Sequence, residues 1–304
     1  MTWEVKSLNG PSLIAGVNPT LDYRFGVDQS ETEAISLTDK LTFTRSSVGT
    51  YVNFSGLVDE VASNVPRFDY SSSNRGLLIE PSSTNLCTYS SNFSQWITGN
   101  PAVNEIIKRN AEIAPDGTLS AVESRVTLYG GLARLVSVTS GVTYRVSVWL
   151  KAKSGVTYPY VGVAVGIDTV SGTNYGATLN SNKKWFRATH TCTANSTTTM
   201  QIYFGRGGGT GQNFYAWGPQ IEVGSTATSF IKTGASAVTR AADSASINGT
   251  GVITGTYTMV EKPAGCAVVS GTNIDLVSGY AAERVMVFPV ALTGPQITSI
   301  RAAM

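Results

Sequence analysis

The chain has 304 residues, a charged fraction of 14% and a net charge of +2. Its basic residues are scattered singly and form no stripe that would neutralise a run of phosphates, so we expect no nucleic-acid partner. No stretch approaches the roughly 18 to 20 apolar residues that cross a bilayer, and the N-terminus has no basic head before an apolar run, so we expect no membrane association and synthesis in a cytosol without export.

In chain order, the first recognisable element is a hairpin in "TYVNFSGLVDEV", residues 50–61. Its expected two-residue turn is Ser55-Gly56, because glycine supplies the positive φ that such turns need. Glycine, serine, threonine and asparagine are abundant along the whole chain, which is typical of β-proteins with many turns.

Period-2 alternation predicts strands with one buried face. It is clearest in "TYRVSVWLKAKSG", residues 143–155. There the side chains of Tyr144, Val146, Val148 and Leu150 fall on one face, and those of Arg145, Ser147, Trp149 and Lys151 fall on the other. Further strands are expected at residues 121–128, 132–138, 185–192, 198–205 and 214–223.

The many short strands and turn-rich connections predict an all-β fold, an antiparallel β-sandwich of the jelly-roll type with a small β-rich C-terminal region. The exception is a helix expected in the final segment "TGPQITSIRAAM". Beyond residues 232–239 large core residues become sparse, so we place a boundary there.

The residues with nucleophilic chemistry show no catalytic arrangement. Cys87, Cys192 and Cys266 lie far apart and cannot all pair, so we interpret them as small buried hydrophobes. His190, the sole histidine, would share a strand face with Cys192, but no third orienting group is evident. We therefore expect His190 to be a half-buried strand residue.

A glycine-rich segment and the spacing of the acidic residues both indicate structural roles and not catalytic ones. The glycine-rich "GRGGGTG" of residues 205–211 lacks the spacing of a phosphate loop and leads into a strand. The acids of the main β region are Asp116, Glu123, Asp168 and Glu222. Their spacing brings no two together as glycoside cleavage requires, although a pair formed by the fold stays open. We predict no catalytic residue and no cofactor.

The aromatic side chains are numerous enough for a sugar-stacking platform: Trp96, Trp149, Trp185, Trp217, Tyr158, Tyr160, Tyr175 and Tyr215. Core packing is the usual role of such rings. The glycan-binding candidates that we name are Trp149, Tyr158, Tyr160 and Tyr175. Trp149 stands out because the alternation of its strand directs it away from the core face.

A series of motifs resembles, in order, the shared leading region of a group of bacteriophage virion proteins: "TLDYRF", "LTFTRSSVGTYVNFSGLVDE", "NVPRFDY" and "GLLIEPSSTNLCTYSSNFSQW". These proteins are usually regarded as tail-fibre, tail or head-decoration components. The later segments "TYRVSVWLKAKSG", "KKWFRATHTCTA", "NFYAWGPQIEVGSTATSFIKT" and "VTRAAD" resemble the jelly roll that follows, which is similar to carbohydrate-binding modules. The resemblance spans residues 20–243.

The resemblance implies a division of the chain into an N-terminal arm (1–19), an extended strap and hairpin region packed on the sandwich (20–92), the jelly roll (93–233) and a C-terminal β region (234–304). In the strap, Pro66 and Pro81 fix extended backbone, and apolar residues anchor a polar segment. Arg67 or Arg75 is expected to pair with Asp69 or Glu80.

One departure concerns metal binding. Many carbohydrate-binding jelly rolls carry a calcium-ligating aspartate in the last strand, in a pattern like aromatic-Tyr-x-Asp. The corresponding region here reads "FYAWGPQIE", with Trp217 and Gly218 in its middle. No metal site is therefore predicted, although backbone carbonyls and another acid stay open as ligands.

The resemblance implies a non-enzymatic virion structural protein located at the virion surface. Its jelly roll either decorates and stabilises the particle or binds cell-surface glycan. The expected partners are other virion proteins and further copies of the chain, with a trimer favoured and the C-terminal region as the assembly element. The alternatives are a glycan depolymerase or glycosidase, and a free carbohydrate-binding accessory module.

Overall fold

The computed structural model describes residues 21–24, 41–71, 76–93, 95–98, 106–125, 132–158, 161–166, 170–181, 184–206, 212–248, 256–262, 266–270, 273–276, 280–282, 284–288 and 292–303. The chain divides into two compact units. The first, here called the sandwich unit, is Ser83–Arg240. The second, the flanking unit, combines Met1–Ser82 with Ala241–Met304.

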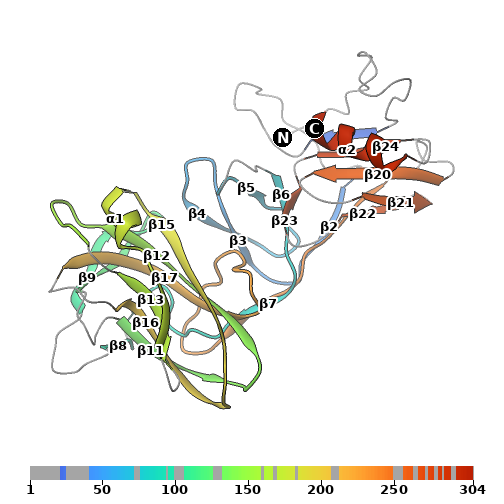
Figure 1. Cartoon of the computed structure of the whole chain (residues 1–304). Coiled ribbons are helices and arrows are strands. Elements are labelled where there is room, and N and C mark those ends of the chain that lie inside the picture. The colour runs from blue at the N-terminus through green and yellow to red at the C-terminus, as the bar shows by residue number, and fades with distance from the viewer. Residues whose placement is uncertain are drawn as a thin grey trace. The chain divides into compact units, whose positions relative to one another are not determined.

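The sandwich unit consists of two antiparallel five-stranded sheets, which confirms the predicted all-β sandwich (Figure 1). One sheet has the order β15 (Phe186–Thr193), β12 (Thr143–Ala152), β17 (Asn213–Val223), β10 (Leu119–Arg125) and β9 (Ile106–Ile113). The other has the order β14 (Val170–Asn174), β13 (Gly162–Gly166), β16 (Thr198–Arg206), β11 (Leu132–Val138) and β8 (Ile97–Thr98). A short ladder of β7 (Ser83–Asn85) with β18 (Val238–Arg240) completes the unit.

The alternation predicted for β12 is confirmed. Tyr144, Val146, Val148 and Leu150 are each at most 3% exposed and belong to the core between the two sheets. Trp149 and its neighbours on alternate positions point to the opposite side of the sheet. That side is called the outer face below. Burying apolar side chains on one face of each strand is what joins the sheets.

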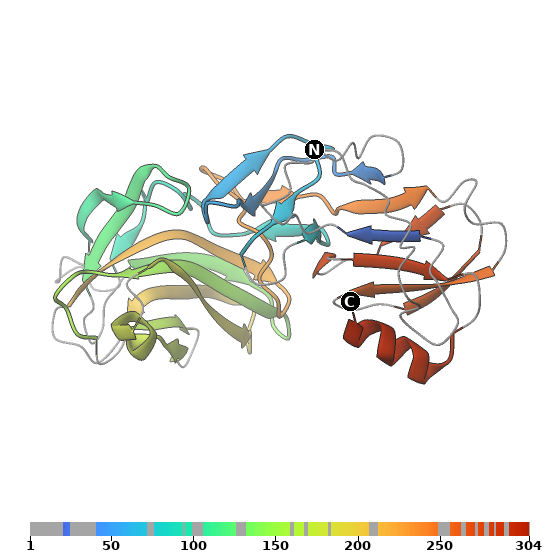
Figure 2. The same cartoon turned by 90° about the horizontal axis from the view of Figure 1, so that it is seen from above.

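The expected terminal helix is present as α2 (Gly294–Ala303), which packs on β20 (Thr256–Lys262) (Figure 2). A second helix, α1 (Gly176–Ser181), was not predicted, because six residues are too few to show a helical period. Leu179 anchors α1 in the core with no exposed surface. Neither helix of the described residues is long and apolar enough to cross a membrane.

Among the described residues, the flanking unit has three small antiparallel sheets that combine strands from both ends of the chain, and a two-stranded hairpin that is described below. The first is β1 (Leu21–Arg24), β24 (Arg284–Phe288), β20 and β21 (Cys266–Ser270). The second is β2 (Leu41–Thr44), β19 (Ser244–Asn248) and β22 (Asn273–Asp275). The third is β23 (Tyr280–Ala282), β6 (Gly76–Ile79) and β5 (Phe68–Asp69).

This pairing differs from the expected arrangement in two ways. The sandwich unit begins at Ser83 and ends at Arg240, outside the predicted limits of 93 and 233. The backbone partners of strap strand β6 are β5 and β23, and strands of the C-terminal region pair with N-terminal strands of the same chain. Pairings between residues 200 or more positions apart leave no periodic signal in either segment. The predicted arm, residues 1–19, lies outside the described residues.

The predicted hairpin is confirmed as β3 (Gly49–Val52) and β4 (Val58–Val61), but its turn is longer than expected. Asn53 N donates to Leu57 O at 2.7 Å, so three residues lie between the bonded pair. Gly56, at φ +78°, closes a β-turn by donating from its N to Asn53 O. A β-turn followed by a glycine at positive φ is the usual three-residue connection, and its glycine resembles that of a two-residue turn in sequence.

Candidate functional site

The outer face of the sheet that contains β12 and β17 carries a group of polar and aromatic side chains. Strand register aligns these side chains in rows across the sheet. Trp149 on β12 lies opposite Trp217 on β17, and Lys151 lies opposite Tyr215. Tyr215 in turn lies opposite Glu123 on β10. The rows extend from a covered end to an open end.

At the covered end, residues 224–233 lie over the sheet. Arg187 Nη1 donates to Thr228 O at 2.6 Å, and Gln220 Nε2 donates to Ser229 O at 3.1 Å. The Phe230 ring lies 4.6 Å from the Trp217 ring, centroid to centroid. This end of the face is therefore closed by the chain itself.

Glu222 is sequestered under the same segment. Its carboxylate accepts hydrogen bonds from Thr228 N at 3.1 Å, from the Thr228 hydroxyl and from Ser83 Oγ at 2.7 Å. The side chain has no exposed surface. Three donors satisfy this buried carboxylate, so it has a structural role in joining β17 to residues 83 and 228.

Trp149 points away from the core as predicted, but its ring is only 8% exposed. The Arg187 guanidinium carbon lies 4.5 Å from the ring centroid on one side, and the Phe230 ring packs edge-on at 5.6 Å. Gly218 also contacts the ring closely: a Cβ at that position would lie 2.9 Å from Trp149 Cε3. A ring enclosed in this way presents no face to a sugar.

Of the other named glycan-binding candidates, Tyr158 and Tyr175 do not form an exposed platform with Trp149. Tyr158 is 1% exposed, and its hydroxyl donates to Asn213 O at 2.6 Å. Burial raises the pKa of Tyr158 to about 12. Tyr175 is half-buried against the core, with its hydroxyl donating to Thr189 O at 2.6 Å. Tyr160 lies outside the described residues.

The open end of the outer face has no such cover among the described residues. Eight side chains form it: Lys108, Glu112, Glu123, Arg125, Lys151, Lys153, Trp185 and Tyr215. Lys151 Nζ lies 3.3 Å from Glu112 Oε1 and 6.0 Å from the Trp185 ring centroid. Trp185 Nε1 donates to Ile113 O at 2.9 Å, which fixes the indole beside β9. The Lys151 ammonium therefore lies over the Trp185 indole ring.

The second ion pair of the open end has the shorter distance and the less exposed carboxylate. Lys153 Nζ lies 2.6 Å from Glu123 Oε1, which also accepts from Asn213 Nδ2 at 2.6 Å. Burial alone would raise the pKa of Glu123, but the hydrogen bonds from Lys153 and Asn213 outweigh it and lower the pKa below its usual value. Burial raises the pKa of Tyr215, so its hydroxyl stays protonated at neutral pH.

The acids named from the sequence are not brought together as a glycosidase pair among the described residues. Glu123 lies opposite Tyr215, and Glu222 is seven positions further along β17. At about 3.3 Å per residue this separation exceeds 20 Å, against the roughly 5 to 10 Å that glycoside cleavage needs. Asp116 Oδ1 accepts from Thr118 N at 3.0 Å within its turn. Asp168 lies outside the described residues.

His190 and Cys192 share a side of β15 as predicted, but each has a separate partner. His190 Nδ1 lies 3.1 Å from Thr173 Oγ1, and Cys192 Sγ lies 3.8 Å from Met200 Sδ. Burial raises the pKa of the Cys192 thiol, which disfavours the thiolate that a nucleophile needs. Cys87 is fully buried as expected. The side chain of Cys266 is not among those that the structure describes.

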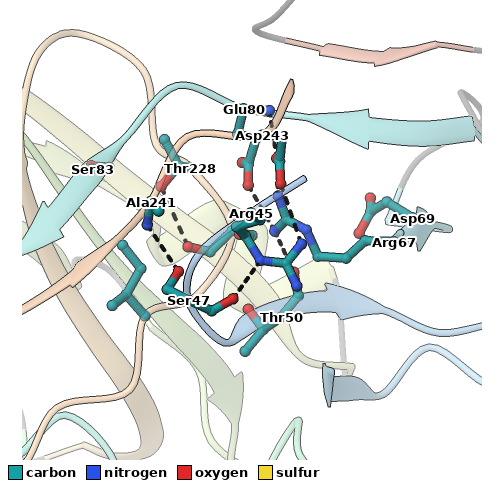
Figure 3. Close-up of polar contacts among 12 residues, drawn as sticks. Arg45, Ser47, Thr50, Arg67, Asp69, Glu80, Ser83, Thr228, Ala241 and Asp243 are labelled. Carbon is teal, nitrogen blue, oxygen red and sulfur yellow. Dashed lines mark hydrogen bonds and ion pairs between the residues drawn. The ribbon is translucent and has the colours of Figure 1, made fainter. Parts of the chain in front are cut away.

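The flanking unit contains a buried ion cluster, called the clasp here: Arg45, Arg67, Glu80 and Asp243 (Figure 3). Arg45 Nη1 lies 3.2 Å from Asp243 Oδ1, and Arg67 Nη1 lies 2.9 Å from Glu80 Oε2. Arg67 Nη2 also pairs with Asp243 Oδ2. The pairing of Arg67 with Glu80 confirms one of the pairs expected in the strap. Asp69 instead accepts from Val52 N at 2.8 Å.

The clasp has a structural role. Its two cations and two carboxylates balance, and the Arg45, Arg67 and Asp243 side chains have no exposed surface. Arg45 Nη2 also donates to Ala62 O at 2.8 Å, and Glu80 N donates to Asp243 Oδ2 at 2.8 Å. The cluster thereby joins three separate stretches of the unit. The sequence did not indicate the role of Asp243, because its partners lie more than 160 positions away.

The described residues hold no group of three His, Cys, Asp or Glu side chains that could bind a metal ion. In the segment "FYAWGPQIE", Trp217 is fully buried and donates from Nε1 to Ser120 Oγ at 3.0 Å.

Comparison with known proteins gives no family. No protein-family model and no curated protein matches the chain. The chain is similar to a structure described as "CBM4 structure and function", with 17% identity and a TM-score of 0.29 over 46% of this chain and 94% of that one. It is also similar to the tripod from the baseplate of bacteriophage Tuc2009, with 14% identity and a TM-score of 0.28 over 78% and 85%.

A third similar structure is dimeric latent PorU from Porphyromonas gingivalis, with 8% identity and a TM-score of 0.21 over 88% of this chain and 29% of that one. Because all three TM-scores are below 0.5, these likenesses carry no functional argument.

Proposed function

We propose that this chain is a non-enzymatic structural protein of a bacteriophage virion, of the tail-fibre or head-decoration type, and that its sandwich binds cell-surface glycan through the open end of the outer face. The virion assignment rests on the ordered motif series of residues 20–243. The observation that carries the glycan assignment is the open end itself.

At the open end, Trp185 and Tyr215 are half-buried and not fully enclosed, unlike Trp149 and Tyr158. Sugar rings present C–H faces that stack on aromatic rings, and their hydroxyls bond to charged groups at the edge of a stack. Lys151 lies over the Trp185 ring and pairs with Glu112, and Glu123 lies opposite Tyr215. An aromatic surface bordered by hydrogen-bonding groups is the arrangement that such binding needs.

Binding of the full-length chain to an array of bacterial surface glycans tests the proposal. We expect Trp185→Ala and Tyr215→Ala to lower the affinity by about tenfold or more, as loss of a stacking ring does. Tyr203→Ala on β16 of the other sheet is the matched control and should bind as the unmodified chain does. Loss of glycan binding in the Tyr203 variant, with binding retained in the Trp185 and Tyr215 variants, would show that the open end is not the binding site.

Two further results would overturn the other parts of the proposal. Release of reducing sugar from any glycan would overturn the non-enzymatic assignment. Absence of the chain from purified particles would overturn the virion assignment.

A further inference from the structure

The charge of the open end points to a particular class of glycan. Around Tyr215 the face carries four cations, Lys108, Arg125, Lys151 and Lys153, and two carboxylates, Glu112 and Glu123. Four positive charges against two negative charges leave a formal charge of +2. The surface is therefore complementary to an anion, whereas the whole chain, with 22 basic and 20 acidic residues, is nearly balanced.

The two excess cations lie next to Glu123. Lys108 is opposite Glu123 in the β9–β10 ladder, and Arg125 Nε lies 3.5 Å from Asn213 Oδ1. Within the described residues neither Lys108 nor Arg125 has a carboxylate at ion-pair distance. Arg109, the neighbour of Lys108, turns away and donates to Phe93 O at 3.4 Å. Asp116 lies in the turn of the β9–β10 hairpin, and Lys184 precedes Trp185 along the chain, so these two flanking charges offset each other.

Of the two ion pairs, the one beside Trp185 is the one that a ligand can exchange. The Lys151 and Glu112 side chains are each 26% exposed, and an exposed pair of this kind contributes only about 0 to 1 kcal/mol. Glu123, by contrast, is 9% exposed and is held by both Lys153 and Asn213. A ligand carboxylate can thus replace Glu112 at Lys151 while the Glu123 pair stays in place.

We propose that the open end binds a polysaccharide that contains uronic acid, with a sugar ring stacked on Trp185 and its carboxylate bound by Lys151. This inference rests on the proposed function, since it names the glycan class for the same site. A hexuronate carries its carboxylate directly on the ring. The Lys151 ammonium lies over the indole, 6.0 Å from its centroid, so a hexuronate that stacks on the indole next to the ammonium brings its carboxylate to Lys151. A glycerol-phosphate polymer also carries one negative charge per repeat, but it is disfavoured because its glycerol units offer no ring to stack on Trp185.

The test compares the full-length chain on three polymers by calorimetry: alginate, the same alginate after chemical reduction of its carboxyl groups, and a glycerol-phosphate teichoic acid. We expect binding to alginate that is at least about tenfold tighter than to the reduced polymer, the equivalent of one charge-assisted hydrogen bond. Affinity for alginate should also fall between about 50 and 300 mM salt, because surface charges are screened.

Two variants locate the contact. Lys151→Gln should lower the affinity for alginate about tenfold and leave that for the reduced polymer unchanged. Lys232→Gln, an exposed lysine in the same unit, should change neither. Equal binding of both alginates, or tighter binding of teichoic acid, overturns the uronate inference and leaves glycan binding intact. If none of the three polymers and no glycan on the array binds, the proposed function itself fails.

Discussion

Two buried arginines share the carboxylate of Asp243, so removing it should lower the free energy of unfolding substantially. Asp243→Ala leaves Arg45 and Arg67 with Glu80 as the sole carboxylate of the clasp, in a site with no exposed surface. Leaving a buried charge without its partner costs about 3 to 5 kcal/mol, so we expect a large drop in the urea concentration at which the flanking unit unfolds.

Glu60→Ala is the matched control, because Glu60 is an exposed carboxylate of the same unit and surface substitutions change stability by about 0.5 kcal/mol or less. Equal unfolding midpoints for the Asp243 and Glu60 variants would show that the clasp does not stabilise the unit.

His190 gives a prediction about pH. Burial, with a smaller contribution from the Arg145 cation, lowers the pKa of His190 below 6.5. The unfolded chain then binds this proton more readily than the folded one, so the free energy of unfolding falls as pH drops below about 6.5 and through the lowered pKa. Since the chain has a single histidine, an NMR titration reports it without ambiguity. His190→Gln should flatten the pH dependence in this window, and a measured pKa at or above 6.5 would contradict the account.

At the scale of elements, Gly218 determines how β17 accommodates Trp149. Its φ of +62° is one that residues with a Cβ rarely adopt, and a Cβ would lie 2.9 Å from the Trp149 ring. We expect Gly218→Ala to destabilise the sandwich unit by about 3 kcal/mol, since overpacking adds to backbone strain. Gly141→Ala is the control: at φ +78° with no atom within 4 Å, it should cost about 1 kcal/mol from strain alone. Equal losses in thermal unfolding would rule out the contact with Trp149.

The same elements show what the sequence could and could not predict. Alternation in β12 placed four core residues and directed Trp149 outward, because side-chain direction is a local property of a strand. It could not predict that Trp149 is covered, because residues 224–233 have no period that indicates where they lie. Tyr215 follows the same alternation on β17, but its proximity to Lys151 depends on strand register, which a single sequence does not report.

The flanking unit shows this limit more strongly. A β-rich C-terminal region was predicted, yet several of its strands have their partners in the N-terminal region of the chain. A pattern of period 2 predicts that a strand exists and which face is buried, but not which strand pairs with it. The hairpin of β3 and β4 was found because its two strands and its glycine turn are adjacent in sequence.

For the whole molecule, the division into units predicts which part folds alone. Ser83–Arg240 is continuous in sequence and has its own core, whereas the flanking unit needs segments from both ends of the chain. The fragment Ser83–Arg240 should therefore fold by itself, and it should retain the glycan binding of the full chain. Circular dichroism without a strand signal, or a fragment that fails to fold, would contradict this prediction.

The assembly of the whole molecule remains a prediction, namely a trimer. Among the described strands of the flanking unit, β1 and β21 each have a partner on one side only, and so do β2 and β22. Edge strands carry backbone N–H and C=O groups that pair readily with another chain, and symmetric contact between identical copies satisfies them. If the flanking unit is the assembly element, the full chain has three times the monomer mass in light scattering and the fragment Ser83–Arg240 is a monomer. A full chain that is monomeric, or a fragment that keeps the trimer, would show that the flanking unit does not assemble the molecule.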